Sequence, residues 1–138
     1  MECCFLAAIL SSCDVSYGFL LFLTSGFVHR DVRWSNLITT NKEGRREWIL
    51  IDLELAGWTG QKCDNDPYPL PHWRLPDGGS VLEAGGVYSE RSDLRMVASQ
   101  LLSGLGFTLS PEADLFKLRL EDGTFRTAAE ALSDPWLQ

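Results

Sequence analysis

The feature that most restricts the fold of this chain is a pair of short β-like segments, Leu37–Thr40 and Trp48–Ile51. The residues Asn41–Gly44 that follow the first segment are polar and end in glycine, as turns do. The pattern predicts a β-hairpin. A hairpin formed by these segments would bring Asn36 and Asp52 together at its open end.

Three oxygen-bearing side chains would then share a small volume. Asp31 lies five residues before Asn36, and Asp52 follows the second β-like segment directly. Proteins bind Mg²⁺ through one or two carboxylates, while phosphate oxygens and water fill its other positions. The sequence therefore predicts hard oxygen ligands for magnesium and phosphate at the open end of the hairpin, with one free carboxylate among them.

Length, charge and cysteine content narrow the functional classes. The chain has 138 residues, enough for one domain with a buried core. Its net charge of −7 argues against a nucleic-acid partner, because contacts to phosphate backbones need clustered Lys and Arg. Cys3, Cys4, Cys13 and Cys63 lack the spacing of zinc ligands, so we expect reduced thiols in a cytoplasmic protein.

The apolar N-terminus lacks the pattern of a targeting or membrane segment. Phe5–Leu10 is short, and Glu2 stands where a signal peptide carries basic residues. Asp14 and several serines interrupt the apolar stretch before it reaches the roughly 18 residues of a membrane span. We therefore expect no signal peptide, no transmembrane helix and no membrane partner. The apolar spacing over residues 1–25 predicts a helix.

Residues 29–54 resemble the catalytic loop and metal-binding segment of protein kinases, a family that carries H-R-D-x-x-x-x-N followed by D-F-G. The first pattern is matched in full by four residues at the family's spacing: His29, Arg30, Asp31 and Asn36. The second pattern is matched at Asp52 alone, because Leu53 and Glu54 replace the Phe and Gly.

Further features of the kinase large lobe follow in the family's order. Residues 55–86, rich in proline and glycine, resemble the activation segment. Asp93 stands where the family anchors the catalytic-loop backbone, in an amphipathic run for which Ser92 is a plausible N-cap. The C-terminus resembles the closing R-x-T-A-x-x-A-L-x-x-P-W motif. Because the A-P-E triplet is missing, the expected partner of Arg126 is Glu83.

The resemblance extends from about residue 19 to the C-terminus and implies a fold. We expect an α+β domain equivalent to the C-terminal large lobe of a divergent kinase, mainly α-helical with a β-hairpin at the catalytic loop. Its parts are a helix before the catalytic loop (residues 1–25), the catalytic loop with the metal-binding segment (29–54), an activation-segment-like loop (55–86) and the C-terminal helices (87–138). No glycine-rich loop or strand lysine precedes His29, so we expect residues 1–138 to be a partial domain without a small lobe.

The resemblance also implies roles for individual residues. Asp31 would accept or orient the proton of the attacking hydroxyl, and Arg33 stands where Ser/Thr kinases carry a lysine directed at the γ-phosphate. Asn36 and Asp52 would bind ATP through magnesium ions. Ile38 would form part of the floor under the adenine ring.

Other residues would support the site without taking part in its chemistry. His29 and Leu53 would pack, and Asp93 would anchor the backbone of the catalytic loop. His72 and Trp73 lie among prolines and are expected to form an aromatic cluster on the surface.

Two functional hypotheses stay open. The first is a protein-kinase-like phosphotransferase that uses ATP and Mg²⁺ on Ser or Thr of a protein substrate, present as a large-lobe fragment and inactive alone. The second is a kinase-like module without catalysis that binds or scaffolds a protein partner. Asp31, Asn36 and Asp52 favour the first, whereas Glu54 and the missing small lobe favour the second. A small-molecule kinase of the aminoglycoside-phosphotransferase type is less favoured, because that type carries H-G-D and Arg30 is present here.

Overall fold

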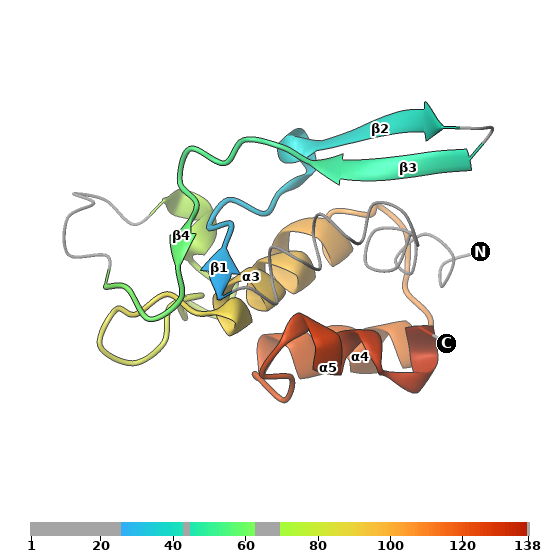
Figure 1. Ribbon diagram of the computed structural model, residues 1–138. Helices are drawn as coiled ribbons and strands as arrows, with labels where there is room; N and C mark the ends of the chain where they lie inside the picture. The colour runs from blue at the N-terminus through green and yellow to red at the C-terminus, as the bar shows by residue number, and fades with distance from the viewer. Residues whose placement is uncertain (1–25, 43–44, 63–69, 138) are drawn as a thin grey trace.

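The computed structural model describes residues 26–42, 45–62 and 70–137. The expectations for a helix over residues 1–25 and for the four cysteines concern residues outside these ranges. The described part combines short antiparallel strands with α-helices, which confirms the α+β class. Figure 1 shows a β-hairpin on one side of the central helix α3, with helices α4 and α5 on the other side.

The predicted hairpin is present. Strand β2 (Leu37–Lys42) pairs antiparallel with strand β3 (Arg45–Leu50), so both strands reach further toward the turn than the sequence predicted. Polar residues extend the ladder there because strand pairing uses backbone groups. Past the end of β3, the Ile51 amide donates to the Asn36 carbonyl at 2.8 Å. This bond brings Asn36 next to the residue that precedes Asp52.

A second pair of strands joins the two segments that flank the hairpin. Strand β1 (Phe27–Val28) pairs antiparallel with strand β4 (Gly57–Trp58). The aromatic rings of Phe27 and Trp58 support the pair, with their centroids 4.2 Å apart. Loop 29–36, which leaves β1, is therefore held at one end by strand pairing and at the other by the hairpin.

Helix α3 (Glu90–Met96) continues without a break into a π-helical turn, Val97–Leu102. The N-cap of α3 is Ser89, whose backbone amide donates to the Ser92 hydroxyl at 3.1 Å. The prediction that Ser92 is the N-cap was wrong, because Ser92 is the third helical residue of a capping box that begins at Ser89.

Two further helices, α4 (Pro111–Glu121) and α5 (Ala128–Leu132), complete the helical side of the molecule. Ser110 caps α4 by accepting from the Ala113 amide at 3.3 Å. The core contains fully buried apolar side chains from loops and helices: Val28, Val32, Trp73, Tyr88, Leu94, Met96, Leu101, Phe116 and Leu120. None of the helices within the described ranges has the length and apolarity that crossing a membrane needs.

Two expectations about packing were wrong. Glu83 accepts from Arg95 Nη1 at 3.2 Å instead of pairing with Arg126. Arg95 lies closer because it projects from α3 beneath this segment, where it also donates to the Val81 carbonyl at 3.1 Å. Leu53 is 55% exposed rather than packed. The chain beyond β3 runs over the surface there, and nothing within the described ranges covers that side chain.

Candidate active site

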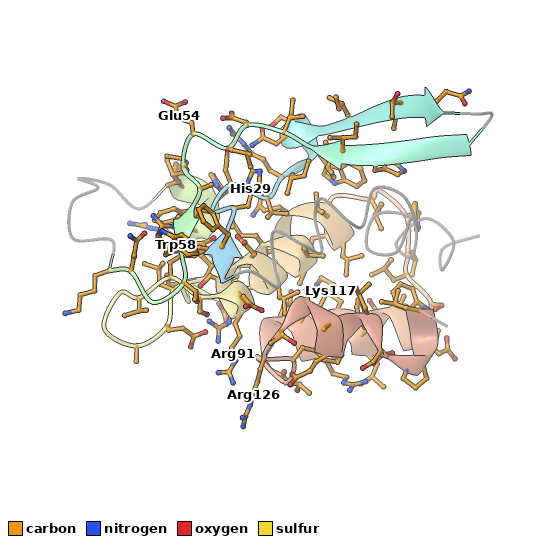
Figure 2. All side chains as sticks on the ribbon, viewed as in Figure 1. His29, Glu54, Trp58, Arg91, Lys117 and Arg126 are labelled. Atoms are coloured by element: carbon orange, nitrogen blue, oxygen red, sulfur yellow. The ribbon has the colours of Figure 1, made fainter. Side chains whose placement is uncertain are left out.

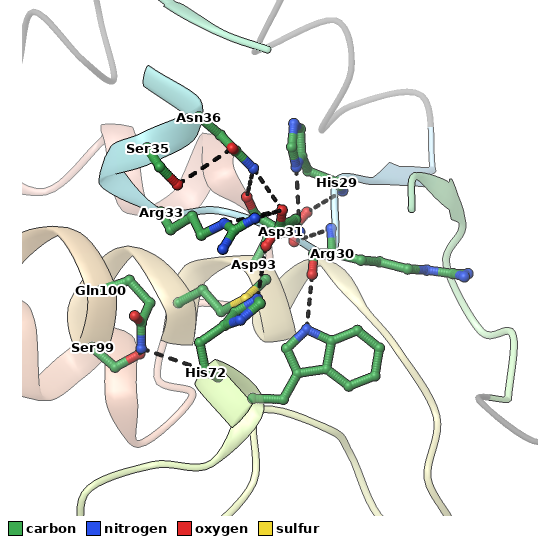
Figure 3. A network of polar contacts seen from close by, with 12 residues as sticks. His29, Arg30, Asp31, Arg33, Ser35, Asn36, His72, Asp93, Ser99 and Gln100 are labelled. Atoms are coloured by element: carbon green, nitrogen blue, oxygen red, sulfur yellow. Dashed lines mark hydrogen bonds and ion pairs between the residues drawn. The ribbon is translucent and has the colours of Figure 1, made fainter. Parts of the chain in front are cut away.

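The Asp93 side chain holds the start of loop 29–36 through its backbone. The Asp93 carboxylate accepts from the His29 amide at 2.7 Å and from the Arg30 amide at 2.9 Å (Figure 3). It also accepts from the Tyr88 hydroxyl at 3.2 Å. Burial raises the pKa of the Asp93 carboxyl to about 6, although the two backbone donors and the Tyr88 hydroxyl favour the charged form. The predicted anchoring role of Asp93 is confirmed by these bonds.

The Arg30 peptide is fixed from the opposite side by an aromatic residue. Arg30 has a left-handed backbone with φ of 68°, and its carbonyl accepts from Trp73 Nε1 at 2.8 Å. Trp73 is 2% exposed and belongs to the core, so the expected surface cluster of His72 and Trp73 was wrong. The tryptophan is buried because its ring packs on Tyr88 and its only polar group finds a buried carbonyl.

The His29 ring connects the loop to the strand end across the site. Its Nδ1 accepts from the Asp31 amide at 3.3 Å, and its Nε2 lies 3.1 Å from the Ile51 carbonyl. Because an amide only donates and a carbonyl only accepts, the neutral tautomer with its proton on Nε2 satisfies both contacts. Burial lowers the pKa of His29, in agreement with this neutral form. In Figure 2 His29 lies inside the fold, whereas Glu54 points outward.

The Asp31 carboxylate is buried and faces charged and polar groups at both oxygens. Its Oδ2 accepts from Asn36 Nδ2 at 2.6 Å and from Arg33, whose Nε and Nη2 lie 3.1 and 3.0 Å away. Its Oδ1 lies 2.8 Å from His72 Nε2. Asp31 is 3% exposed, while Arg33 lies at the surface. Arg33 therefore neutralises Asp31 in this structure (Figure 3).

Asn36 links Asp31 to the open end of the hairpin. Its Nδ2 donates to the Asp31 carbonyl at 2.9 Å as well as to the carboxylate, which turns Oδ1 away from Asp31. Among the described residues, this oxygen meets the Ser35 hydroxyl, at 3.5 Å. Asp52 follows the ladder on the neighbouring strand and is exposed, with a left-handed φ of 69°. The Ile38 side chain is 44% exposed on the hairpin.

The donor set at this end fits magnesium held partly by a nucleotide. Asn36 and Asp52 provide one amide oxygen and one carboxylate, both hard ligands. No group of three His, Cys, Asp or Glu within the described ranges is arranged to hold a metal ion by itself. Mg²⁺ commonly takes only one or two carboxylates and leaves its other positions to phosphate and water, so the donors present suit that mode of binding.

Sequence reasoning missed the contact between His72 and Asp31. The short 3₁₀ turn of His72, Pro71–Trp73, lies in a proline-rich stretch without hydrophobic periodicity. The contact joins residues far apart in the sequence. Proline density predicts turns here, but a turn pattern contains no information about its tertiary partner.

Comparisons with known proteins identify the fold. No family model matches the chain. The structure of the Cydia pomonella granulovirus kinase PK-1 superposes with a TM-score of 0.57 and 16% sequence identity, over 96% of this chain and 59% of that protein. The fold is kinase-like.

Two curated relatives match in sequence. The cytokinesis protein sepH of Aspergillus niger and that of Emericella nidulans are each 29% identical over 113 residues, or 79% of this chain. The chain spans only 8% of the length of either relative.

Proposed function

We propose that this chain is a kinase-like phosphotransferase module that binds Mg-ATP at the open end of its hairpin and acts on a Ser or Thr hydroxyl of a protein substrate. One observation carries the proposal. Asn36 donates to the Asp31 carboxylate through Nδ2, and its backbone carbonyl accepts from the Ile51 amide, one residue before Asp52. One residue is thus bonded both to the proposed position for proton transfer and to the segment that contains the proposed metal ligand Asp52, which supports the proposal because phosphoryl transfer depends on positioning.

The residues divide the chemistry between them. Asp31 orients the attacking hydroxyl and accepts its proton, and the buried bonds to its carboxylate fix its direction. Arg33 balances the charge of Asp31 and lies close enough to the surface to reach a transferring phosphate. Asn36 Oδ1 and Asp52 hold the metal, and Ile38 contacts the base. Magnesium, when bound with ATP, neutralises charge on the phosphoryl group.

Nucleotide binding to these residues alone is expected to be weak. The Ile38 side chain is 44% exposed, so it can cover only one face of an adenine ring. One such contact and a shared metal ion correspond to a Kd of about 1 mM. We therefore expect the 138-residue chain to bind Mg-ATP weakly and to transfer phosphate negligibly. Robust Asp31-dependent transfer by this chain would contradict that expectation.

The second candidate function, a binding module without catalysis, has its own supporting observation. Ile38, Ile51 and Leu53 form an exposed apolar group around the open end, at 44%, 38% and 55% exposure. Glu54 beside them adds a negative charge on the side where phosphates would lie. Both features suit contact with a protein surface more than tight binding of a nucleotide.

Magnesium-dependent binding of ADP, measured by NMR titration at millimolar nucleotide, tests the proposal. Asp52→Asn is expected to abolish the magnesium dependence, because it removes the only carboxylate of the donor set. Glu54→Gln is expected to tighten binding modestly, since it removes a charge that repels phosphate. Asp114→Asn, an exposed change on α4, is the matched control and should have no effect. An ADP affinity that is the same with and without magnesium would overturn the assigned site.

The two candidate functions are separated by an assay of transfer. The longest in-frame product of the transcript that contains this chain is purified and supplied with Mg-ATP and a library of Ser and Thr peptides. Transfer that disappears in Asp31→Asn supports the phosphotransferase. Nucleotide binding without any transfer supports the binding module.

A further inference from the structure

The turn Pro71–Trp73 reaches loop 29–36 through two neighbouring side chains. Trp73 Nε1 donates to the Arg30 carbonyl at 2.8 Å, and His72 Nε2 lies 2.8 Å from Asp31 Oδ1 (Figure 3). The turn is also held from behind, where Gln100 Nε2 donates to the His72 carbonyl at 3.4 Å. The turn is therefore docked by contacts that do not involve the His72 ring.

The two oxygens of the Asp31 carboxylate differ in how many donors they face. Three nitrogen atoms, two from Arg33 and one from Asn36, surround Oδ2 within 3.1 Å. Oδ1 faces only His72 within the described ranges. A carboxylate oxygen has two lone pairs. Oδ1 is therefore the oxygen with an unused lone pair; it is buried in this structure, so a further donor can reach it only where the side chains around the imidazole move.

We propose that His72 is a positioning residue for Asp31: it fixes the rotation of the carboxylate so that the remaining lone pair of Oδ1 faces the acceptor hydroxyl. The inference rests on the proposed function, because it assigns Oδ1 as the oxygen that meets the acceptor. It adds a residue from the activation-segment-like loop to the site. The imidazole then forms one wall of the acceptor position.

The charge state of His72 agrees with this role. At 2.8 Å from a carboxylate oxygen, Nε2 must carry a proton, because two lone pairs would repel each other. Burial lowers the pKa of His72 and the nearby Arg33 lowers it further, while Asp31 raises it. The ring is thus a neutral donor near neutral pH. A neutral donor orients the carboxylate without adding a second positive charge to that of Arg33.

The contact between His72 Nε2 and Asp31 Oδ1 is an electrostatic attraction rather than a well-directed hydrogen bond. The two atoms are close, yet they do not meet the angular criteria of a hydrogen bond, and neither has another hydrogen-bond partner in the described part of the chain. Rotation of the Asp31 carboxylate could improve the angle to His72 only by breaking the contacts of Oδ2 with Arg33 and Asn36. The arrangement therefore depends on His72 and Asn36 together.

Two substitutions of His72 in the isotope-labelled chain test the proposal by NMR, without nucleotide. His72→Phe keeps the ring but removes the donor, whereas His72→Gln keeps a neutral donor. In His72→Phe we expect the Asn36 side-chain amide signals to shift and to exchange about fivefold faster, because the carboxylate that accepts from Asn36 loses the contact that limits its rotation. In His72→Gln we expect them to stay near their original positions. The Trp73 indole signal, which reports the docked turn, should stay in both variants.

Three outcomes would overturn the proposal. The first is an Asn36 amide that is unchanged in His72→Phe. The second is a Trp73 indole that moves together with Asn36, because His72 would then only hold the turn in place. The third is a His72→Gln variant that behaves like His72→Phe. None of these readouts needs nucleotide binding, so failure here is distinct from failure of the proposed function.

A second measurement keeps His72 intact in case its variants do not fold. The chain has 2 histidines, His29 and His72, so their ring signals are easily assigned and titrated. Asp31→Asn should lower the pKa of His72 further, because it removes the carboxylate that raises it. Asp52→Asn is the control and should leave the His72 titration unchanged. An unchanged His72 titration in Asp31→Asn would also overturn the proposal.

Discussion

Asp93 and Asp52 differ in every respect that decides what a carboxylate can do. Asp93 is 1% exposed and accepts two backbone amides and a hydroxyl. Asp52 is exposed and has no hydrogen-bond partner for its carboxylate within the described ranges. The buried Asp93 carboxylate cannot contact a ligand, whereas the Asp52 carboxylate makes no hydrogen bond to the described part of the chain and is accessible to one. Asp93 uses its hydrogen bonds to hold loop 29–36 in place. Asp52 keeps its carboxylate exposed, where a ligand would provide the contacts.

The largest effect should come from removing the anchor. Asp93→Ala removes the acceptor of two buried backbone N–H groups and of a bond from the Tyr88 hydroxyl, so the free energy of unfolding should fall by about 3 to 5 kcal/mol. Urea denaturation measures the change. Asp52→Asn is the matched control, and as a surface change it should stay within about 0.5 kcal/mol. Equal losses in the two variants would remove the contrast between the two carboxylates.

The titration of Asp93 should appear in the pH dependence of stability. Its pKa is about 6 in the folded chain, above the ordinary value of 3.8. The folded state therefore binds the proton more tightly, so this contribution is complete below about pH 4 and is lost as the pH rises through about 6. The loss amounts to about 3 kcal/mol. The difference in unfolding free energy between the natural chain and Asp93→Asn isolates it, and a difference that grows with rising pH would contradict it.

A smaller effect should distinguish two tryptophans. Trp73→Phe keeps an aromatic ring in the core but leaves the Arg30 carbonyl unpaired, at a cost of about 2 kcal/mol. Trp58 is 54% exposed, so Trp58→Phe should change stability by no more than about 0.5 kcal/mol. Thermal or urea unfolding of both variants makes the comparison. A cost for Trp73→Phe no larger than about 0.5 kcal/mol, the limit expected for Trp58→Phe, would show that the turn is not anchored by its indole.

The smallest effect should come from Gly57. A Cβ atom there would lie 2.5 Å from Arg30 Nη2 and 2.8 Å from Gln61 Oε1, so Gly57→Ala must displace the bond between those side chains. Both groups are flexible ends at the surface, and the cost should be about 0.5 kcal/mol. Gln61→Ala removes the same bond. The double variant should therefore cost less than the two single changes added together, and strict additivity would refute the shared cause.

The sequence predicted those parts of the site that depend on short-range order. The turn residues after Thr40 predicted the hairpin, and the hairpin alone brings Asn36 next to the segment that contains Asp52. The anchoring by Asp93 came from the resemblance to kinases, because no local pattern connects residues so far apart in the chain.

The contacts that the sequence missed are tertiary ones. Arg33 was expected to face a phosphate, but in this structure it lies against Asp31, which is the nearest opposite charge. His72 and Trp73 were placed on the surface because proline-rich loops usually lie there. Their burial depends on partners in loop 29–36 and on Tyr88, which come together only once the fold has formed.

The left-handed backbone of Asp52 has a consequence for how substitutions at this residue should be interpreted. With φ of 69°, glycine is the residue that this conformation tolerates best, and a carboxylate-bearing residue is held there at some cost in strain. Selection of variants for stability alone would therefore favour glycine at this position. Selection for a metal-dependent activity would reject it. A screen that scores the same library both ways would rank residue 52 in opposite orders, and such a reversal identifies a position where the backbone and the ligand have conflicting requirements.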